Sequence, residues 1–345
     1  MGKPTVHDIA QEAGVSLATV DRVLNARPGV RNLTALRVQN AIDKLGYVRD
    51  VHAANLARGR HYRFAFVLPE GESQFLQALR GAIEEAGAGL RLDRAELQTV
   101  EVPLNDSAKM IQVLEHLKSQ EIDGLAIMAS ETPVVRDLIA HMKESGIAVV
   151  ALVTDQQNAE RDHFVGIDNV AAGRTAGVLM GRFLGGRKGK VIVVVNTMNA
   201  RDMVQRRQGF DDVLDEQFPN LHGLPTLEGF DEVDRTAQVI SRSLENHKDV
   251  VGLYCAGAGT RGVTKIIAEK GLADTITIIG HELTDHSRQA LSDGLLDVVI
   301  TQNVGHLVRS ATRVLRAKCD GREIIESQER IRIEIVLREN LPNAD

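Results

Sequence analysis

Hydrophobic residues recur at helical spacing in three successive segments at the start of the chain. The first stripe falls at positions i, i+3, i+4 and i+7, at Val6, Ile9, Ala10 and Ala13. The others comprise Val20, Val23 and Leu24, then Val38, Ala41, Ile42 and Leu45. Gly14 is suited to end the first helix and Ser16 to cap the second. The pattern therefore predicts two short helices joined by a tight turn, with a third helix completing a small core.

From Arg63 onward, continuous apolar runs alternate with helical segments. The expected strands are 64–68, 124–129, 148–152, 164–167, 191–195, 250–254, 277–279, 296–301 and 331–337. The expected helices are 75–86, 133–144, 170–183, 204–216 and 263–269. Continuous apolar strands separated by helices are typical of parallel sheets covered on both faces. The body is therefore expected to be α/β, with two doubly wound parallel-sheet lobes that bind ligands at the carboxyl ends of their strands.

Charge is distributed unevenly between the two parts of the chain. Residues 1–60 contain nine Lys and Arg against five Asp and Glu, whereas the whole chain of 345 residues has a net charge of −6. A basic head on an acidic body is expected where only the head contacts a polyphosphate. The polar start and the lack of an apolar run of about 18 residues predict a cytoplasmic protein without a membrane segment. Cys255 and Cys319 lack metal-ligand spacing and are expected to be core residues.

The segment from Val6 to Asn25, with Gly46-Tyr47 after it, resembles the head of the LacI/GalR family of bacterial repressors. The resemblance implies a helix-turn-helix DNA-binding domain over residues 1–49, whose second helix enters the major groove. It places Leu17, Ala18 and Arg22 against base edges, where a guanidinium can bind guanine O6 and N7 in a bidentate pair. A solvated surface charge is the alternative role for Arg22. The other implied DNA-binding positions in the head are Thr5, Ser16, Thr19, Asn25 and Arg31.

Two head positions depart from the family pattern. Asp21 and Arg31 both stand where relatives usually carry Ser. An acid repels phosphate and a base attracts it, so either the phosphate contact has moved or Asp21 pairs with a neighbouring Arg. Residues 50–61 resemble the family's hinge helix, which contributes Asn55 and a Leu56 that wedges into the minor groove. Packing of Leu56 against the body is the alternative.

Residues 62–345 resemble the two-lobed, periplasmic-binding-protein-like type I core of the same family. Lobe 1 is expected at about 62–162 plus 303–325, and lobe 2 at about 163–302 plus 326–345. The resemblance and the strand ends place effector contacts at Glu70, Phe75, Ser130, Asp168, Arg206, Gly257, Glu282 and Gln302. Arg206 matches the family's ligand-gripping arginine and would donate to two hydroxyls or a carboxylate. A charge on the helix surface is the alternative, and Arg206→Ala is expected to remove the ligand response while preserving the fold.

Asp, Arg and Gln together supply donors and acceptors for several hydroxyls, so a sugar, a polyol or a derivative is the expected effector. Many relatives carry Asn-Asp and Asp where this chain has Gly257-Ala258 and His281-Glu282, so some ligand contacts are expected to differ. Sugar rings favour a flat apolar surface, and the candidate aromatic residues are Phe75, Tyr254 and Phe210. Phe210 is also a candidate for the core.

A competing motif runs from Gly257 to Gly262, followed by Glu282. The sequence Gly-Ala-Gly-Thr-Arg-Gly after a strand, with an acid about twenty residues on, matches a dinucleotide-binding fingerprint. No acid/base constellation accompanies it, and the unit does not open a lobe. We therefore expect no cofactor and no metal, and keep a nicotinamide-nucleotide-dependent enzyme as the less favoured alternative.

These observations predict a ligand-responsive transcriptional regulator rather than an enzyme. The expected protein is a repressor of carbohydrate or polyol uptake or catabolism genes, whose affinity for a palindromic double-stranded DNA operator changes with its effector. The chain ends soon after strand 331–337 without a heptad pattern, which favours a homodimer over a coiled-coil tetramer. A solute-binding protein of a transporter is the main alternative from another class.

Overall fold

The computed structural model describes residues 4–24, 27–47, 60–90, 94–103 and 106–342. The chain divides into two compact units, residues 1–60 and 61–345. Each unit has its own hydrophobic core, and each is described by itself. The expected Asn25, Asn55 and Leu56 contacts lie outside the described residues, as does nearly all of the expected hinge.

The first unit consists of three helices, α1 (Val6–Ala13), α2 (Leu17–Leu24) and α3 (Asn32–Leu45). Thr5 and Asp8 form a capping box at the start of α1, and Gly14 ends the helix with a left-handed backbone at φ 62°. The Ser16 hydroxyl accepts a hydrogen bond from the Thr19 amide at 3.3 Å, which is the predicted cap of α2. The buried residues that all three helices contribute are Ile9, Ala10, Ala13, Val20, Val38 and Ala41.

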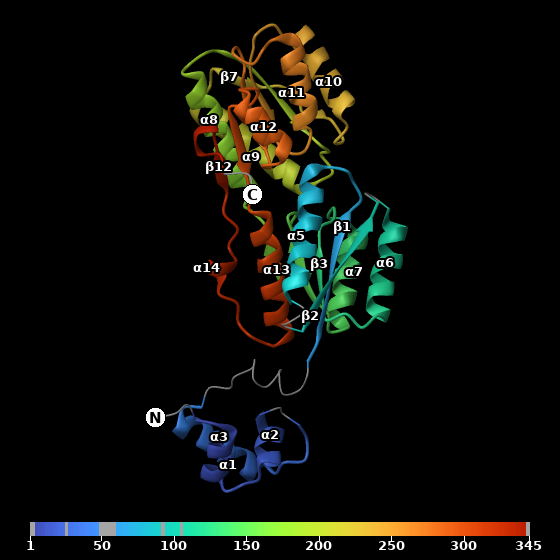
Figure 1. The fold of residues 1–345 in the computed structure, drawn as a ribbon, viewed down its shortest axis with the longest axis vertical. Coiled ribbons are helices and arrows are strands. Elements are labelled where there is room, and N and C mark those ends of the chain that lie inside the picture. The colour runs from blue at the N-terminus through green and yellow to red at the C-terminus, as the bar shows by residue number, and fades with distance from the viewer. Residues whose placement is uncertain (1–3, 25–26, 48–59, 91–93, 104–105, 343–345) are drawn as a thin grey trace. The chain divides into compact units, whose positions relative to one another are not determined.

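Lobe 1 is built on a parallel sheet in the order β2-β1-β3-β4-β5 (Figure 1). Its strands are β1 (Tyr62–Pro69), β2 (Ala95–Val102), β3 (Gly124–Ile127), β4 (Ala148–Leu152) and β5 (His163–Val165). One face is covered by α5 (Gln74–Leu90) and α13 (Val304–Cys319), and the other by α6 (Ser107–Ser119) and α7 (Pro133–Glu144). The central strands are buried on both faces, which explains their uninterrupted apolar sequences.

Lobe 2 has a sheet in the order β12-β11-β10-β9-β6-β7, with β8 also paired to β6. Its strands are β6 (Gly189–Val195), β7 (Leu221–Gly223), β8 (Leu227–Glu228), β9 (Val250–Cys255), β10 (Thr277–His281), β11 (Val298–Thr301) and β12 (Glu334–Val336). Helices α8 (Asn169–Leu184) and α9 (Arg201–Gln217) cover one face. The other face carries α10 (Val233–Asn246), α11 (Thr260–Lys270) and α12 (Asp285–Ser292).

The predicted fold class is confirmed, but β2, β7 and β8 were not among the expected strands, and the assignments of β5 and β12 also differ. β5 pairs with β4, so it belongs to lobe 1, and the expected boundary at 162/163 falls one strand too early. β12 is shorter than the expected strand 331–337 and pairs antiparallel to β11, because its segment returns to lobe 2 from the far side of lobe 1. The expected return of residues 303–325 to lobe 1 is observed, since α13 packs on β3 and β4.

Helices α8 and α9 cross with their backbones in contact. A Cβ atom at Gly173 would lie 2.0 Å from the Arg206 carbonyl oxygen, and one at Gly209 would lie 2.1 Å from the Val170 carbonyl oxygen. Only glycine permits so close an approach. The crossing therefore fixes the position of the first half of α9, which reaches the space between the lobes.

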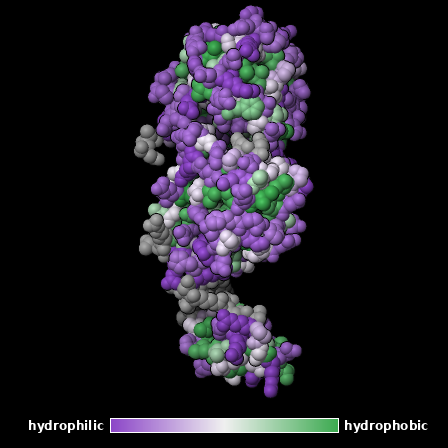
Figure 2. Space-filling view, turned by 90° about the vertical axis from the view of Figure 1, so that its right-hand side faces the viewer, coloured by the Kyte–Doolittle hydropathy of each residue, from purple (hydrophilic) through white to green (hydrophobic). Residues whose placement is uncertain are grey.

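Hydrophilic residues cover most of the visible face of the two-lobed unit, with small hydrophobic patches between them (Figure 2). Within the described ranges, none of the helices combines the length and the apolar character needed to cross a membrane.

Candidate functional site

A cleft of about 900 Å³, counting the part open to solvent, lies between the two lobes. It is formed by the carboxyl ends of strands from both sheets and by the first turns of α5 and α9, which is where doubly wound folds bind ligands. Lobe 1 contributes Pro69, Glu70, Ser73, Phe75, Leu76, Met128, Ala129, Ser130, Val153 and Thr154. Lobe 2 contributes Asn196, Thr197, Ala200, Asp202, Met203, Arg206, Asp231, Gly257, Ala258 and Glu282.

Arg206 is the buried cation of this cleft. Its exposed fraction is 1%, which excludes the alternative of a surface charge. Nε donates to Asn169 Oδ1 at 2.9 Å and Nη1 donates to the Ala256 carbonyl at 2.8 Å. Nη2 lies 3.4 Å from Glu282 Oε1. The guanidinium therefore joins α8, the end of β9 and the end of β10 into one polar network.

Glu282 connects Arg206 to Gln302. The Gln302 amide donates to Glu282 Oε1 at 3.3 Å from behind the cleft wall. Burial raises the pKa of Glu282, although Arg206 and Gln302 oppose the shift. The neighbouring His281 has its pKa lowered well below the usual value, first by burial and then by Arg206. A neutral imidazole fits its contact with the Tyr254 hydroxyl, where Nε2 lies 2.8 Å from the oxygen.

Two further carboxylates, Asp202 and Asp231, complete the polar wall of lobe 2. Asp202 lies in the first turn of α9 and is 6% exposed, with Oδ1 buried and unpaired. Asp231 accepts a hydrogen bond from Asn196 Nδ2 at 3.3 Å, and its Oδ1 is also unpaired. Burial raises the pKa of Asp231. These oxygens require a donor, because buried polar groups are normally hydrogen-bonded.

Three residues of the cleft wall have a left-handed backbone without being glycine. The φ angles are 63° at Val153, 60° at Asp231 and 66° at Glu282. Such conformations are rare outside glycine, especially for a β-branched residue, and they concentrate at functional sites. The observation agrees with a binding site at this edge of both sheets.

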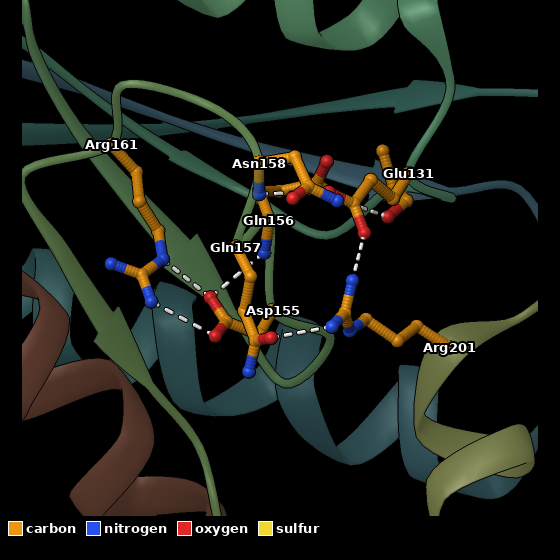
Figure 3. A network of polar contacts seen from close by, with 8 residues as sticks. Glu131, Asp155, Gln156, Gln157, Asn158, Arg161 and Arg201 are labelled. Atoms are coloured by element: carbon orange, nitrogen blue, oxygen red, sulfur yellow. Dashed lines mark hydrogen bonds and ion pairs between the residues drawn. The ribbon is translucent and has the colours of Figure 1, made fainter.

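Polar contacts join the lobes through α9 and through α12. Arg201, at the first position of α9, donates to Glu131 and to Gln157 in the loops that follow β3 and β4 (Figure 3). Glu131 also accepts a hydrogen bond from the Asn158 amide at 2.9 Å. Burial acts to raise the pKa of Glu131, but the hydrogen bonds from Asn158 and Arg201 lower that pKa overall. The second contact is between the His286 amide and Gln74 Oε1, 3.3 Å apart. Contacts of this kind hold two lobes closed around a cleft.

The cleft brings together six of the eight expected effector-binding residues, namely Glu70, Phe75, Ser130, Arg206, Gly257 and Glu282. Gln302 lies behind Glu282 rather than in the wall. Asp168 does not line the cleft, because its side chain caps α8 by accepting the Ala171 amide at 2.9 Å. Of the candidate aromatic residues, only Phe75 lines the cleft.

Tyr254 and Phe210 are fully buried and stack at 4.6 Å in the core of lobe 2. The suggestion that Tyr254 presents a surface to a sugar is therefore wrong.

Several lining residues were missed by the sequence analysis: Thr154, Asn196, Thr197, Asp202 and Asp231. Asn196 and Thr197 follow the predicted strand 191–195, so the polar residues directly after that strand were an available signal. Asp231 gave no such signal, since it follows a strand of two residues that pairs with β6.

The glycine motif at residues 257–262 has a packing role in this fold. A Cβ at Gly257 would lie 2.7 Å from Met203 Sδ, and one at Gly262 would lie 2.6 Å from the Val233 carbonyl. The acid of the apparent fingerprint, Glu282, is engaged by Arg206 and Gln302. The approach of the α10 backbone thus explains Gly262 without a dinucleotide, whereas Gly257 meets only the end of the flexible Met203 side chain.

The described residues contain no cluster of three or more His, Cys, Asp and Glu side chains placed to hold a metal ion. Neither Cys255 nor Cys319 forms a disulfide, and burial raises the pKa of the Cys255 thiol to about 12. A protonated, enclosed thiol is unreactive.

The first unit presents an exposed surface on α2. Leu17, Ala18 and Arg22 are exposed, while Val20 is buried beneath them in the head core. Thr5, Ser16 and Arg31 are also exposed, and Thr19 is half-buried. Asp21 lies 3.3 Å from Arg27, so it does pair with a neighbouring arginine. The predicted base-reading side chains are therefore available on the outer face of the second helix.

A trihelical head with an exposed second helix, joined to a two-lobed domain with a polar cleft, defines the class of DNA-binding proteins that carry a periplasmic-binding-protein-like domain. Residues 5–50 match the family model of the bacterial regulatory proteins of the lacI family. Residues 64–323 match the periplasmic binding protein domain. The chain therefore belongs to the periplasmic binding protein domain family over most of its length, and carries a lacI-family regulatory domain at its N-terminus.

Among similar proteins, the HTH-type transcriptional repressor PurR of Mannheimia succiniciproducens is 26% identical over 345 residues, covering 98% of each chain. Catabolite control protein A of Priestia megaterium is 29% identical over 150 residues, and this match spans 42% of each chain. The uncharacterized HTH-type transcriptional regulator YkvZ of Bacillus subtilis is 36% identical over 120 residues, or 35% of this chain and 36% of that protein. The matches to the last two therefore span about two fifths or less of their length.

Solved structures share the fold of the second unit. An ABC transporter solute-binding protein from Burkholderia graminis, in complex with D-arabinose, superposes with a TM-score of 0.74 at 21% identity, covering 81% of this chain and 96% of that chain. GanP, a glucose-galactose binding protein from Geobacillus stearothermophilus, gives 0.73 at 19% identity, covering 82% and 100%.

Proposed function

We propose that this chain is a ligand-responsive, DNA-binding transcription regulator that acts in the cytoplasm as a homodimeric repressor. The observation that carries the proposal is the presence, in one chain, of an exposed helix-turn-helix surface and a cleft with buried, unpaired polar groups. A solute-binding protein requires only the cleft, whereas a regulator requires both the cleft and the helix-turn-helix surface. The likeness of residues 5–50 to lacI-family regulators supports the regulator.

The DNA-binding role rests on α2. Arg22 would bind a guanine in the major groove, while Leu17 and Ala18 would contact apolar base edges such as a thymine methyl. Thr5, Ser16, Thr19, Asn25 and Arg31 would contact the backbone or its surroundings, and Asn55 and Leu56 the minor groove. Two copies related by a twofold axis would require a near-palindromic operator.

The effector role rests on the cleft between the lobes. The carboxylates of lobe 2, the Ser130 and Thr154 hydroxyls and the Asn196 amide suit a ligand with several hydroxyl groups, and Phe75 offers a flat apolar surface. The sugar-binding neighbours in fold support a sugar, a polyol or a derivative. Closure of the lobes on the ligand would change the spacing of the two heads in the dimer and thereby the affinity for the operator.

The proposal is tested by selecting binding sites from random duplex DNA with the purified full chain. We expect a twofold symmetric site whose affinity falls steeply with salt, because phosphate contacts release counterions. Arg22→Ala should weaken binding to the selected site, because it removes the proposed contact with a base. Arg37→Ala removes an exposed arginine from α3 and serves as the control for that change. Failure to enrich any site, together with ligand binding by the cleft, would instead favour a solute-binding protein.

A further inference from the structure

The lobe 2 wall of the cleft carries more buried negative charge than its own cations can balance. Asp202 and Glu282 are 6% and 9% exposed, and Asp231 is half-buried beside them. Each has one buried oxygen without a hydrogen-bond partner, Oδ1 of both aspartates and Oε2 of Glu282. Arg206 is the one cation among the described residues that line the cleft, and Glu70 adds a fourth carboxylate at its entrance.

Arg206 cannot satisfy these groups. Its Nε and Nη1 atoms donate to Asn169 and the Ala256 carbonyl, and Nη2 reaches only Glu282 Oε1 at 3.4 Å, so none of its three nitrogens is hydrogen-bonded to Asp202 or Asp231. Burial raises the pKa of both Asp231 and Glu282, and the nearby Asp202 raises both further, so the carboxylates lie close enough to repel one another. A neutral hydroxyl can donate a hydrogen bond to such a group, but it leaves the excess charge in place.

We propose that the effector carries a protonated amine on a hydroxylated carbon skeleton, as in an amino sugar or an amino polyol. The inference rests on the proposed function of the cleft and deepens it. An ammonium group supplies three donors and one positive charge, which are what the unpaired oxygens of Asp202, Asp231 and Glu282 lack. The hydroxyls of the ligand then face Ser130, Thr154 and Asn196, and its carbon skeleton packs on Phe75. A sugar acid would add a fifth carboxylate to the cleft and is excluded by repulsion.

The test compares ligands that differ only in charge. Calorimetry and thermal shift of the full chain would use D-glucosamine against D-glucose, D-galactosamine against D-galactose, and 1-amino-1-deoxy-D-glucitol against D-glucitol, with D-gluconate as the anion. At least one amine is expected to bind at least about tenfold more tightly than its neutral partner, as one charge-assisted hydrogen bond would give. D-gluconate should produce no shift.

Asp202→Asn keeps the size of the side chain and removes one charge of the cluster. It should reduce the preference for the amine over the neutral partner at least about tenfold. Asp215→Asn removes an exposed carboxylate from the same helix and should leave that preference unchanged. Equal or tighter binding of the neutral partners, binding of D-gluconate, an unchanged preference in Asp202→Asn, or no response to any amine would each overturn the proposal. Site-specific DNA binding in the same preparation would leave the regulator function standing in each of these cases.

Discussion

Replacing Arg206 by alanine should strongly destabilise the two-lobed unit, contrary to the sequence-based expectation that this change preserves the fold. The side chain is 1% exposed, and its guanidinium holds Asn169, the Ala256 carbonyl and Glu282. Removing one partner of a buried ion pair costs about 3–5 kcal/mol, because the remaining charge is left uncompensated. We expect a loss in that range for Arg206→Ala, since Glu282 loses its neighbouring cation and the Ala256 carbonyl loses the Arg206 donor.

A double-mutant cycle with Glu282→Gln shows how much of the lost stability comes from the uncompensated carboxylate. If the uncompensated carboxylate causes most of the loss, the double variant should be more stable than the sum of the two single changes predicts, by at least about 1 kcal/mol. Arg174→Ala is the matched control, because its pair with Glu216 is exposed and such pairs contribute about 0–1 kcal/mol.

Urea unfolding followed by far-ultraviolet circular dichroism suits this chain, which contains no tryptophan. The free energy of unfolding of each variant would be compared in the absence of ligand. A loss below about 1 kcal/mol for Arg206→Ala, or additive single changes, would refute the reasoning, since either result means that the buried network does not hold the lobe together.

Four further predictions follow from the two units. Arg22→Ala should weaken binding to the selected operator by about 1–3 kcal/mol and barely change binding to scrambled DNA; an equal loss on both would place Arg22 at the backbone. Asp231→Asn should stabilise the unit at pH 7.5 by about 0.5–2 kcal/mol. The reason is that burial raises the pKa of Asp231 in the folded state. The contribution of Asp231 to stability is therefore present at low pH and is lost as the pH rises through the raised pKa. Thermal unfolding at pH 4 should therefore show a smaller gain, and equal gains would contradict the assignment. Arg201→Ala removes the contact with Glu131 across the cleft, so small-angle scattering should show a larger radius of gyration for the unliganded chain than for wild type. Sedimentation should give a dimer, and a stable tetramer without DNA would contradict the expected assembly.

Much of the fold could be predicted from the sequence because its central strands are buried on both faces. The strands at 148–152 and 191–195 are continuous apolar runs, and the structure places both inside their sheets. The edge strand β2 alternates polar and apolar residues, so it gave no such run and was missed. The head was recognised from three stripes and two caps, which are local features.

The cleft was predictable where a residue directly follows a predicted strand, as Ser130 does after the expected strand 124–129. It was not predictable where long-range contacts decide the role of a side chain. Asp168 was assigned to the cleft for want of a local feature: it follows β5 as expected, but it caps α8 by accepting a hydrogen bond from the Ala171 amide three residues on. Tyr254 ends a strand, but its ring turns toward Phe210 in the core because α9 lies against that face. Asp202 resembles an ordinary acid in a first helical turn, and only the closeness of α8 and α9 brings it into the cleft.

The position of α13 also constrains how the protein is made. This helix covers β3 and β4 of lobe 1, but it is encoded at residues 304–319, after nearly all of lobe 2. During synthesis, one apolar face of the first sheet, which includes Phe64 and Val150, therefore remains without its full cover until most of lobe 2 has been translated. Contacts between residues so far apart in the sequence slow folding. Until they form, the exposed hydrophobic surface favours aggregation. Lobe 1 is thus completed only after most of lobe 2 has been translated, so a chaperone is expected to act on the nascent chain before the ribosome reaches α13.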